Sequence, residues 1–496
     1  MINFKTTLCL LLGSLGALAA DGGEAAASVR PNVILIMTDD QGYGQMGAHG
    51  QPWLKTPALD SLHATSVRFS QFMVSPTCAP TRAALMTGRH PLECGVTHTI
   101  LQRERLAPGL RTLPEMLSER GYVSGIFGKW HLGDEAKHQP SARGFNEVFI
   151  HGAGGIGQAY GGSCADVPKN KYQNPVVRHN GSFVQTNGFC TDVFFSAAIN
   201  WMDGERKKDR PFFAYISTNA PHGPFIAPEK SRERFEACGF PKAAAGFYGM
   251  IENIDENVGR LMDQLENWNL LENTVVIFLS DNGTTSAGSG RLKKLGVDQD
   301  GKAMMGYNAG MKGFKGSPDE GGVRVPFFVR WDGKFKGDRD VDVLSAHIDL
   351  VPTLVDLTGG EAPTGLRGRS LLPLLEGSAE RMPDRLLFTH VARWPKGDEP
   401  NEYRRKKFSV RSEQFRLVGE DALYDMQSDP AQTTNVAAQH PEVVKNMLAR
   451  YDAFWDKARP LMVNEEEPLA EERPFWVDYQ RQLESEGGIP DWDGNQ

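Results

Sequence analysis

The segment around Cys78 has residue types and spacing that suit a nucleophilic site. Cys78 is followed by Pro80 and Arg82, and the same run ends in Thr87-Gly-Arg89. Proline is favoured in the first turn of a helix, so this spacing predicts a helix that begins close to Cys78. A helix N-terminus carries partial positive charge, which stabilises an anion formed there. Arg82, one turn further on, could hold the side chain at position 78. The alternative is a buried thiol before an ordinary helix.

Side chains with oxygen ligands stand at two other places in the chain. Asp39 and Asp40 follow one apolar run, and Asp281 and Asn282 follow another. A set of oxygen ligands suits a hard divalent cation, calcium or magnesium, and does not suit zinc. Two adjacent aspartates by themselves are more typical of a turn or a helix cap. The repetition of the pattern at a second strand end favours a metal site.

Three apolar segments are predicted to be the strands that position these residues. They are Asn32–Met37, Phe212–Ser217 and Thr274–Leu279, and each is followed by polar residues. Continuous apolar runs are typical of strands buried on both faces, and ligands bind at the carboxyl ends of strands in open α/β sheets. Between the second and third segments, apolar residues from Ile251 to Leu265 recur at helical spacing. This alternation indicates an α/β fold.

The pattern changes from about Asp384 onward. Phe408–Arg411 and Phe415–Val418 alternate in the manner of half-exposed antiparallel strands, and helical periodicity follows from Val443 to Phe454. We therefore predict a smaller α+β domain in this part of the chain. The last stretch, Glu465–Gln496, is acidic and is predicted to be irregular.

The N-terminus and the overall composition restrict the class of protein. Residues 1–20 have the pattern of a signal peptide, with Lys5 before an apolar run from Leu8 to Ala20. No later segment reaches ~18 uninterrupted apolar residues, so we expect an exported protein, periplasmic or secreted, without a membrane anchor. The net charge of -8 is mild for 496 residues and argues against a nucleic-acid partner.

The cysteines leave one residue to be explained. After removal of the signal peptide five remain, which is an odd number for an oxidising compartment. If Cys78 serves chemistry, Cys94, Cys164, Cys190 and Cys238 remain, and the sequence does not choose among their three possible pairings. Alternatively, several of them are buried free thiols.

These motifs together resemble those of the formylglycine-dependent sulfatases, arylsulfatase-like members of the alkaline phosphatase superfamily. Their signature is Cys-x-Pro-x-Arg followed by Thr-Gly-Arg, as found here from Cys78 to Arg89. The resemblance implies that Cys78 is oxidised to formylglycine, whose hydrate supplies the attacking oxygen. It also implies a partner that installs this group, either a formylglycine-generating enzyme or an anaerobic sulfatase-maturing enzyme.

The resemblance assigns roles to further residues. It implies one calcium ion per chain, with magnesium as the rival on chemistry alone, held by Asp39, Asp40, Asp281, Asn282 and the group made from Cys78. In Gly128-Lys-Trp-His131, Lys129 would anchor the sulfate and His131 would take a proton from the hydrate. The second histidine is His222, which would protonate the leaving alcohol. Lys315 would bind both the sulfate and the leaving oxygen, with Lys312 as a competitor for that role, and His98 is a candidate substrate contact.

The implied fold is a large mixed β-sheet sandwiched by helices, with a smaller C-terminal α+β domain built on a four-stranded antiparallel sheet. We place the catalytic domain at residues 29–383 and the smaller subdomain at residues 384–496. The expected activity is removal of sulfate from a sulfated carbohydrate or polysaccharide. The polar insert Gly152–Thr191 is a candidate for shaping the glycan pocket. The alternatives are a phosphonate or phosphate ester hydrolase with the same nucleophile, and an exported binding protein without catalysis.

Overall fold

The structure is a computed structural model that describes residues 30–156, 172–285, 296–297, 303–304, 306–468 and 472–494. Residues Pro31–Gln496 form one compact unit, to which all the elements below belong. The predicted signal peptide, residues 1–20, lies outside the described residues.

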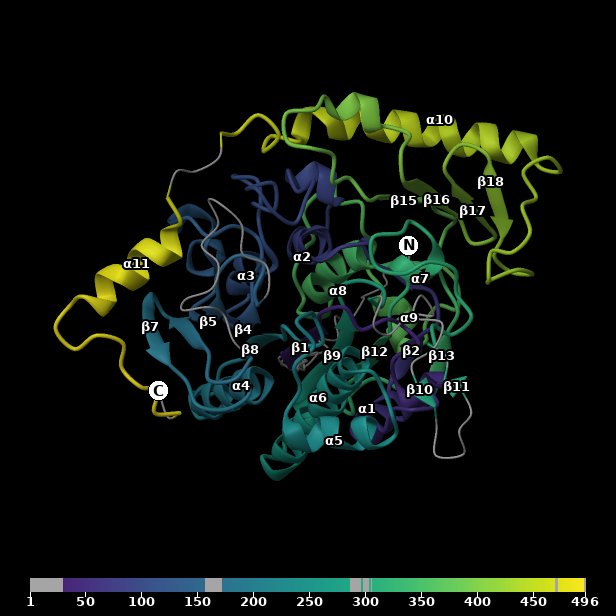
Figure 1. Cartoon of the computed structure of the whole chain (residues 1–496). Coiled ribbons are helices and arrows are strands. Elements are labelled where there is room, and N and C mark those ends of the chain that lie inside the picture. Colours follow the sequence, from purple (N-terminus) through teal and green to yellow (C-terminus); the bar gives the residue numbers. More distant parts are fainter. Residues whose placement is uncertain are drawn as a thin grey trace, which may run out of the picture. The chain divides into compact units, whose positions relative to one another are not determined.

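A sheet of ten strands organises the compact unit (Figure 1). Its centre consists of parallel strands in the order β9-β1-β8-β4-β5. Their bounds are Thr274–Ser280, Asn32–Thr38, Phe212–Ser217, Val123–Lys129 and Glu147–His151. The three strands predicted from apolar runs are therefore confirmed, and β1 lies between the other two. The predicted α/β class with a mixed sheet is confirmed as well.

Shorter strands extend the sheet at both edges. Beyond β9 lie β12, β2 and β13, and β12 runs antiparallel to β9. Beyond β5 lie β6 and β7, both joined in antiparallel fashion. Their bounds are Phe327–Arg330, Val67–Phe69, Arg339–Val341, Val176–His179 and Ser182–Gln185.

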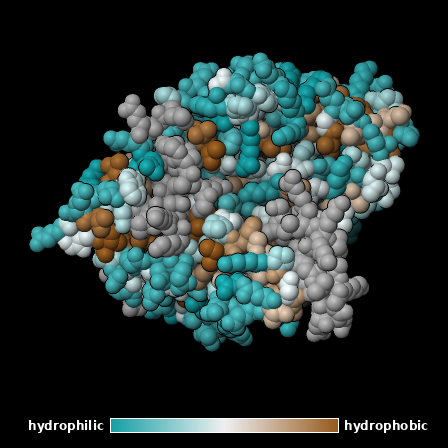
Figure 2. All heavy atoms as spheres, viewed as in Figure 1, coloured by the Kyte–Doolittle hydropathy of each residue, from teal (hydrophilic) through white to brown (hydrophobic). Residues whose placement is uncertain are grey.

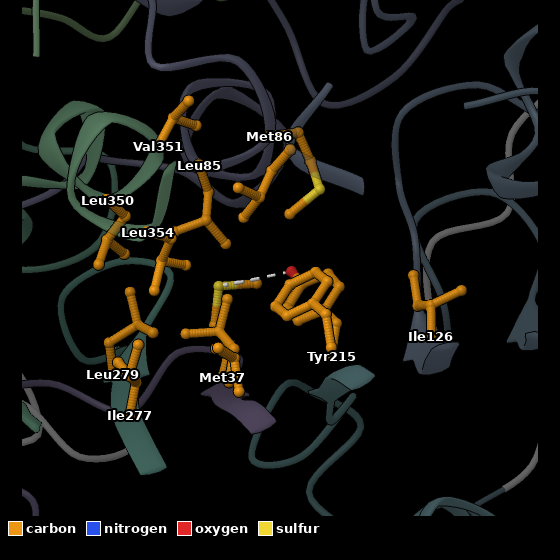
Figure 3. Packing of buried hydrophobic residues seen from close by; sticks show 14 of the residues in the cluster. Met37, Leu85, Met86, Ile126, Tyr215, Ile277, Leu279, Leu350, Val351 and Leu354 are labelled. Carbon is orange, nitrogen blue, oxygen red and sulfur yellow. Dashed lines mark hydrogen bonds between the residues drawn. The ribbon is translucent and has the colours of Figure 1, made fainter. Parts of the chain in front are cut away.

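Helices cover both faces of this sheet. Successive residues of a strand point to opposite faces, and in β1 the residues on both faces are apolar and buried. Ile34 and Ile36 of β1 pack with the helices α1, α4 and α6, and the last of these is the crossover helix expected from the apolar periodicity. Val33, Leu35 and Met37 face α2, α3 and α8. Figure 3 shows this second layer, in which Met37 and Tyr215 lie beneath Leu85, Met86 and Leu354. The helices span Pro57–Ala64, Cys190–Arg206, Lys242–Asn267, Cys78–Thr87, Leu113–Ser118 and Leu350–Leu357.

The predicted C-terminal domain contains a separate four-stranded antiparallel sheet, β15-β16-β17-β18. The strands span Leu387–His390, Phe408–Arg411, Phe415–Val418 and Ala422–Asp425. Helix α10, Pro441–Ala458, packs Tyr451 and Trp455 against this sheet. This arrangement confirms the expected smaller α+β layer. The remaining short elements are β3, β10, β11, β14, α5, α7 and α9, which span Phe72–Met73, Gly296–Val297, Ala303–Met304, Ser345–Ala346, Glu229–Ala237, Glu320–Val323 and Leu372–Glu376.

The prediction of an irregular C-terminal stretch is wrong for part of it. Residues Pro474–Leu483 form helix α11, with Pro474 in its first turn. Phe475 and Tyr479, one helical turn apart, are buried and contact Phe183 of β7. This i,i+4 apolar pair packs on the large sheet. The acidic composition of the stretch concealed it.

The visible surface (Figure 2) is mostly hydrophilic, and the described cysteines are unpaired. The face seen in Figure 2 is mostly hydrophilic, and its apolar atoms occur in separate small patches. Within the described part of the chain, no helix combines the length and apolar character needed to cross a bilayer. Cys78, Cys94, Cys190 and Cys238 are all free thiols, and Cys164 lies outside the described residues.

Candidate active site

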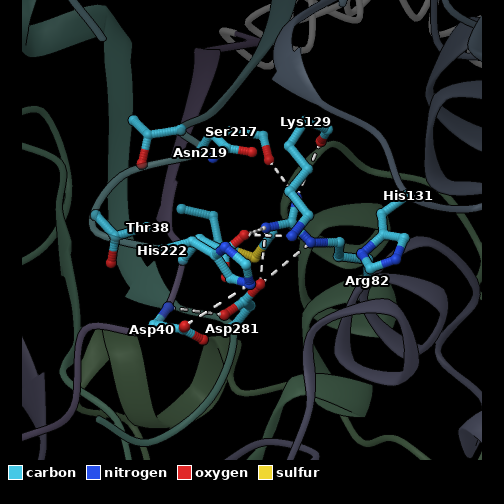
Figure 4. Close-up of polar contacts among 12 residues, drawn as sticks. Thr38, Asp40, Arg82, Lys129, His131, Ser217, Asn219, His222 and Asp281 are labelled. Atoms are coloured by element: carbon cyan, nitrogen blue, oxygen red, sulfur yellow. Dashed lines mark hydrogen bonds and ion pairs between the residues drawn. The ribbon is translucent and has the colours of Figure 1, made fainter. Parts of the chain in front are cut away.

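The polar residues that follow four neighbouring strands meet at one edge of the sheet. β1, β9, β8 and β4 run parallel and in register, so that Met37 pairs with Ser217 and Thr38 with Ser280. The chain therefore delivers Asp39, Asp281 and Lys129 to the same place, as expected for the carboxyl ends of parallel strands. Figure 4 shows Lys129 and Asp281 converging with Arg82 and His222.

Cys78 is the first residue of α2, as the spacing to Pro80 predicted. The helix is buried along its whole length, and the exposed fraction of Cys78 is 0%. Its sulfur and one carboxylate oxygen each from Asp39 and Asp281 lie within 4.8 Å of one another. Burial opposes ionisation of the thiol, but the ammonium groups of Lys129 and Lys315 outweigh it and lower the pKa of Cys78. The two lysines thus favour an anion at this position more than the neighbouring Asp39 disfavours it.

Arg82 connects all four of these strand ends. Its guanidinium donates from Nη2 to Asp281 Oδ2 at 2.7 Å and from Nη1 to Ser217 Oγ at 2.6 Å. A further bond reaches the carbonyl oxygen of Lys129 at 2.9 Å, and Asp39 Oδ2 lies 3.5 Å from Nη2. Only 1% of the Arg82 side chain is exposed. A planar group with several donors suits this buried junction, which an ammonium could not fill.

Two lysines pair with the two adjacent aspartates. Lys129 forms an ion pair with Asp39, and both side chains are fully buried. Lys315 Nζ lies 2.5 Å from Asp40 Oδ1. Lys312 instead donates to the Tyr424 hydroxyl at 2.8 Å and lies over that ring. The structure thus brings Lys315 to the site and places Lys312 against the small sheet.

The histidines occupy three different positions. His222 Nδ1 lies 2.7 Å from the carbonyl oxygen of Gly223, and Nε2 lies 4.0 Å from Asp40 Oδ2. A carbonyl can only accept, so Nδ1 carries the proton and Nε2 faces the site. His131 Nε2 bonds to the carbonyl oxygen of Thr99 at 2.8 Å, and His98 is half-buried on the same loop. Burial lowers the pKa of all three imidazoles, that of His98 to about 3.

The charges at the site depend on one another. Three carboxylates, Asp39, Asp40 and Asp281, face Arg82, Lys129 and Lys315. Burial and the charge of Asp39 raise the pKa of Asp281 well above its usual value. Burial alone would raise the pKa of Asp39 too, but Lys129, His222 and Arg82 hold it well below its usual range. Two carboxylates that compete in this way would both be stabilised by a cation between them.

Unsatisfied oxygens support a metal at this place. Asp39 Oδ1 and Asn282 Oδ1 are buried and accept no hydrogen bond from the described residues. Buried acceptors without a donor are costly and rare, and a bound cation is one way to satisfy them. Asn282 Nδ2 donates to Asp40 Oδ1 at 2.7 Å, which leaves its carbonyl oxygen free to act as a ligand. The oxygen-rich set fits calcium or magnesium.

Among the described charged side chains of the site, exposure to solvent differs. Lys129 and Asp39 have 0% of their side chains exposed, whereas His222 has 12% and Lys315 has 16%. His222 and Lys315 are therefore nearer to solvent than Lys129 and Asp39.

Three residues that contact the site were not among those predicted. Ser217 holds Arg82, and its position at the end of an apolar strand was a usable signal. Asn219 lies between that strand and His222 and is fully buried. Tyr172 donates a hydrogen bond to the carbonyl oxygen of His222, and no pattern in its neighbourhood indicated this contact.

Comparisons with known proteins agree with this geometry. A family model described as Sulfatase matches residues 31–360, and one described as N-sulphoglucosamine sulphohydrolase, C-terminal, matches residues 318–454. The chain is similar to N-acetylgalactosamine-6-sulfatase of Canis lupus familiaris, with 31% identity over 75% of this chain and 70% of the relative. It is 30% identical to arylsulfatase A of Homo sapiens, over 87% of this chain and 83% of that protein.

A solved structure has the same fold over nearly the whole chain. The crystal structure of Ps i-CgsB matches with a TM-score of 0.74 and 26% identity, covering 91% of this chain and 97% of the other. The same protein in complex with k-i-k-neocarrahexaose matches with a TM-score of 0.72.

Proposed function

This chain belongs to the sulfatase family and is a sulfuric ester hydrolase. We propose that it removes sulfate from a sulfated carbohydrate, and that it uses a formylglycine made from Cys78 and a bound calcium ion. The observation that carries the proposal is the position of Cys78 at the start of α2, within 4.8 Å of ligand oxygens from Asp39 and Asp281. A nucleophile at that point attacks a sulfur atom whose oxygens face a helix N-terminus and two lysines.

In this proposal the lysines bind the sulfate and the histidines transfer protons. Lys129 and Lys315 hold the sulfate from two sides, and Lys315 also reaches the oxygen that leaves. His222 presents Nε2 toward the opening of the site and, once protonated on both ring nitrogens, donates the Nε2 proton to the departing alcohol. His131, fixed through Thr99, accepts a proton from the group at position 78 when sulfate is released. Arg82 keeps Asp281 and Ser217 in place around them.

The calcium ion would be held by Asp39, Asp40, Asp281 and Asn282. A bound divalent cation supplies positive charge to the sulfate oxygens. Free carboxylate and amide oxygens of this set support the assignment. General acid catalysis contributes ~10²–10⁴-fold, or roughly 3–5 kcal/mol, whereas slow ester hydrolyses need well over ~10 kcal/mol. The lysines, the arginine and the cation therefore have to provide most of the stabilisation.

A sulfated carbohydrate is the substrate class that the relatives favour. One is named for a sulfated sugar, and the similar solved structure is in complex with a neocarrahexaose. We further propose that the mature protein is exported, to the periplasm or beyond, with a catalytic domain at residues 29–383 and a smaller subdomain at 384–496. A formylglycine-generating or anaerobic sulfatase-maturing enzyme is the partner that this requires.

The first test is the mass of the tryptic peptide that contains Cys78. The protein should come from a host that matures sulfatases. Formylglycine is about 18 Da lighter than cysteine, because the SH group and a hydrogen are exchanged for a carbonyl oxygen. We expect the lighter peptide, together with release of sulfate from at least one member of a panel of sulfated glycans. An unmodified thiol with no turnover would support the exported binding protein instead.

Matched aryl esters distinguish the reaction class. We expect 4-nitrophenyl sulfate to be hydrolysed faster than the corresponding phosphate and phosphonate esters. The reverse order would favour the phosphonate or phosphate ester hydrolase that shares this nucleophile.

A further inference from the structure

Tyr172 is a buried residue that touches the segment carrying His222. Its hydroxyl lies 2.5 Å from the carbonyl oxygen of His222 and 3.1 Å from that of Asn219. It also accepts a hydrogen bond from Asn219 Nδ2 at 2.8 Å. Only 1% of Tyr172 is exposed, and burial raises the pKa of its hydroxyl well above the usual value. The hydroxyl therefore stays protonated and acts as a donor.

Asn219 connects the same segment to a second point. Its Oδ1 accepts a hydrogen bond from the backbone nitrogen of Ile156 at 2.9 Å. A Cβ added at Gly155 would stand 1.9 Å from that oxygen, so the backbone approaches Asn219 as closely as glycine permits. Both amide atoms of Asn219 are thus used, one toward Ile156 and one toward Tyr172.

The segment from Asn219 to His222 is otherwise anchored on the side of the metal ligands. The backbone nitrogen of Asp39 donates to the carbonyl oxygen of Ala220 at 3.1 Å, and that of His222 donates to Asn219 at 3.0 Å. The His222 ring itself has its Nδ1 on Gly223. The Thr218 hydroxyl donates to the carbonyl oxygen of Ala220 at 2.7 Å, and the Tyr172 hydroxyl donates to that of His222.

We propose that Tyr172, together with Asn219, is a positioning residue that sets the His222 imidazole for proton donation to the leaving alcohol. The inference rests on the proposed function, in which His222 is the general acid. Tyr172 does not touch the substrate in this scheme. It acts through the backbone of His222, because a small rotation of that peptide would move Nε2 away from the leaving oxygen.

The placement also links the acid to the polar insert. Ile156 and Tyr172 lie within Gly152–Thr191, the part of the chain expected to shape the glycan pocket, and both hold Asn219. The aromatic ring of Tyr172 stacks on Phe189 with centroids 5.4 Å apart, and its carbonyl oxygen accepts from the backbone nitrogen of Cys190 at the start of α4. Contacts to the insert can therefore reach His222 through one buried hydroxyl.

Tyr172→Phe tests the proposal because it keeps the stacked ring and removes only the hydroxyl. General acid catalysis matters most when the leaving alcohol is a weak acid. We expect kcat/KM to fall about 10- to 100-fold for an alkyl or sugar sulfate and less than about threefold for 4-nitrophenyl sulfate, whose leaving group needs little protonation. His222→Ala should give the same dependence on the leaving group with a larger amplitude.

A matched control is Tyr122→Phe. Tyr122 is also buried, and its hydroxyl donates to the carbonyl oxygen of Pro31 at 2.6 Å, before the first residue of β1. It should lower thermal stability by a similar amount without changing the ratio of the two substrates. An equal fold-loss of kcat/KM on both substrates in Tyr172→Phe, or no loss on either, would overturn the positioning role.

A readout without turnover separates this inference from the proposed function. The ring nitrogens of 15N-labelled histidine report the environment of His222, assigned with His222→Gln. We expect the His222 signals to shift or broaden in Tyr172→Phe and to remain unchanged in Tyr122→Phe. Unchanged signals would overturn the inference even if sulfate esters are hydrolysed. Shifted signals in a protein without sulfatase turnover would support the coupling and count against the proposed function alone.

Discussion

Arg82 shows how individual residues at this site depend on each other. Its guanidinium satisfies Asp281, Ser217 and a backbone carbonyl at once, in a place with 1% exposure. Removing one partner of a buried ion pair leaves the other charged and desolvated, which costs about 3–5 kcal/mol. The same logic applies to each lysine and its aspartate. Variants at these positions therefore need a control that separates chemistry from stability.

Lys315 and Lys312 provide such a comparison. Lys315→Ala should lower kcat/KM by about 10²- to 10³-fold, because it removes one preorganised donor at the sulfate and at the leaving oxygen. Lys312→Ala should change it by less than about fivefold, because this ammonium contacts Tyr424 and a partly exposed carboxylate. Steady-state kinetics on one sulfate ester check both. A larger loss in Lys312→Ala would mean that the two lysines have been assigned the wrong way round, and equal losses would contradict the distinction between them.

Calcium should stabilise the fold through the same carboxylates. At a concentration 100-fold above its Kd, a ligand that binds only the native state adds about 2.7 kcal/mol. We expect the melting temperature to fall by several degrees after chelation and to recover with calcium more fully than with magnesium. Asp39→Asn should lose most of this response, because it removes a charged ligand with little change of shape. Full recovery with magnesium alone at equal concentration would favour that ion.

The strands position the site through close contacts between their backbones. Gly128 precedes Lys129 at the end of β4, with φ at 117°. A Cβ at this position would stand 1.9 Å from the carbonyl oxygen of Ser217 on β8. A side chain would thus push apart the two strands that carry Lys129 and Ser217 and would also strain the backbone.

Gly128→Ala should therefore destabilise the protein by more than 1 kcal/mol, the lower end of about 1–3 kcal/mol for overpacking, and should reduce activity by displacing Lys129. The control is Gly204→Ala in α4, where an added Cβ meets no atom within 4 Å. It should stabilise the helix by about 0.5–1 kcal/mol. Urea unfolding midpoints measure both effects, and a neutral Gly128→Ala would show that β4 and β8 can separate at low cost.

The small sheet contacts the segment that follows Lys315. Arg416 of β17 pairs with Glu320 at 2.5 Å and donates to the carbonyl oxygen of Pro318 at 2.9 Å, with both charged side chains buried. The segment that follows Glu320 is joined to the end of β9, because Gly283 donates to the carbonyl oxygen of Gly322 at 3.0 Å. The C-terminal domain therefore helps to hold the loop of Lys315 and the strand end of Asp281.

Arg416→Met should destabilise the protein by about 3–5 kcal/mol, because buried Glu320 loses its 2.5 Å partner and keeps only the more distant Arg324 at 3.9 Å. The double variant Arg416→Met/Glu320→Gln should recover part of this loss, since neither member of the pair then carries a charge. A double-mutant cycle in urea, completed with Glu320→Gln, measures the coupling. Additive losses would show that the ion pair does not hold the two parts together.

Local patterns in the sequence were sufficient for the strands, the start of α2 and the chemistry of the strand ends. Apolar runs identify strands buried on both faces, and the step from Cys78 to Pro80 marks a helix start, because each depends on neighbours in the chain. Local patterns also indicated the α/β class and a smaller α+β domain, whereas the mixed sheet and the four strands of the small sheet were implied by the family resemblance. The catalytic roles of the assigned residues remain predictions, although the structure brings those residues together.

Only the tertiary structure decided which residues meet. The contacts of Lys315 with Asp40, of Ser217 with Arg82 and of Tyr172 with His222 join residues from different elements. The free oxygens of Asp39 and Asn282 are likewise defined by donors that do not reach them. Helix α11 was missed because the acidic composition of the stretch concealed the pair Phe475 and Tyr479, whose apolar contacts are with β7. Such contacts depend on strand register and on where each crossover returns the chain, and neither is encoded in the spacing of neighbouring residues.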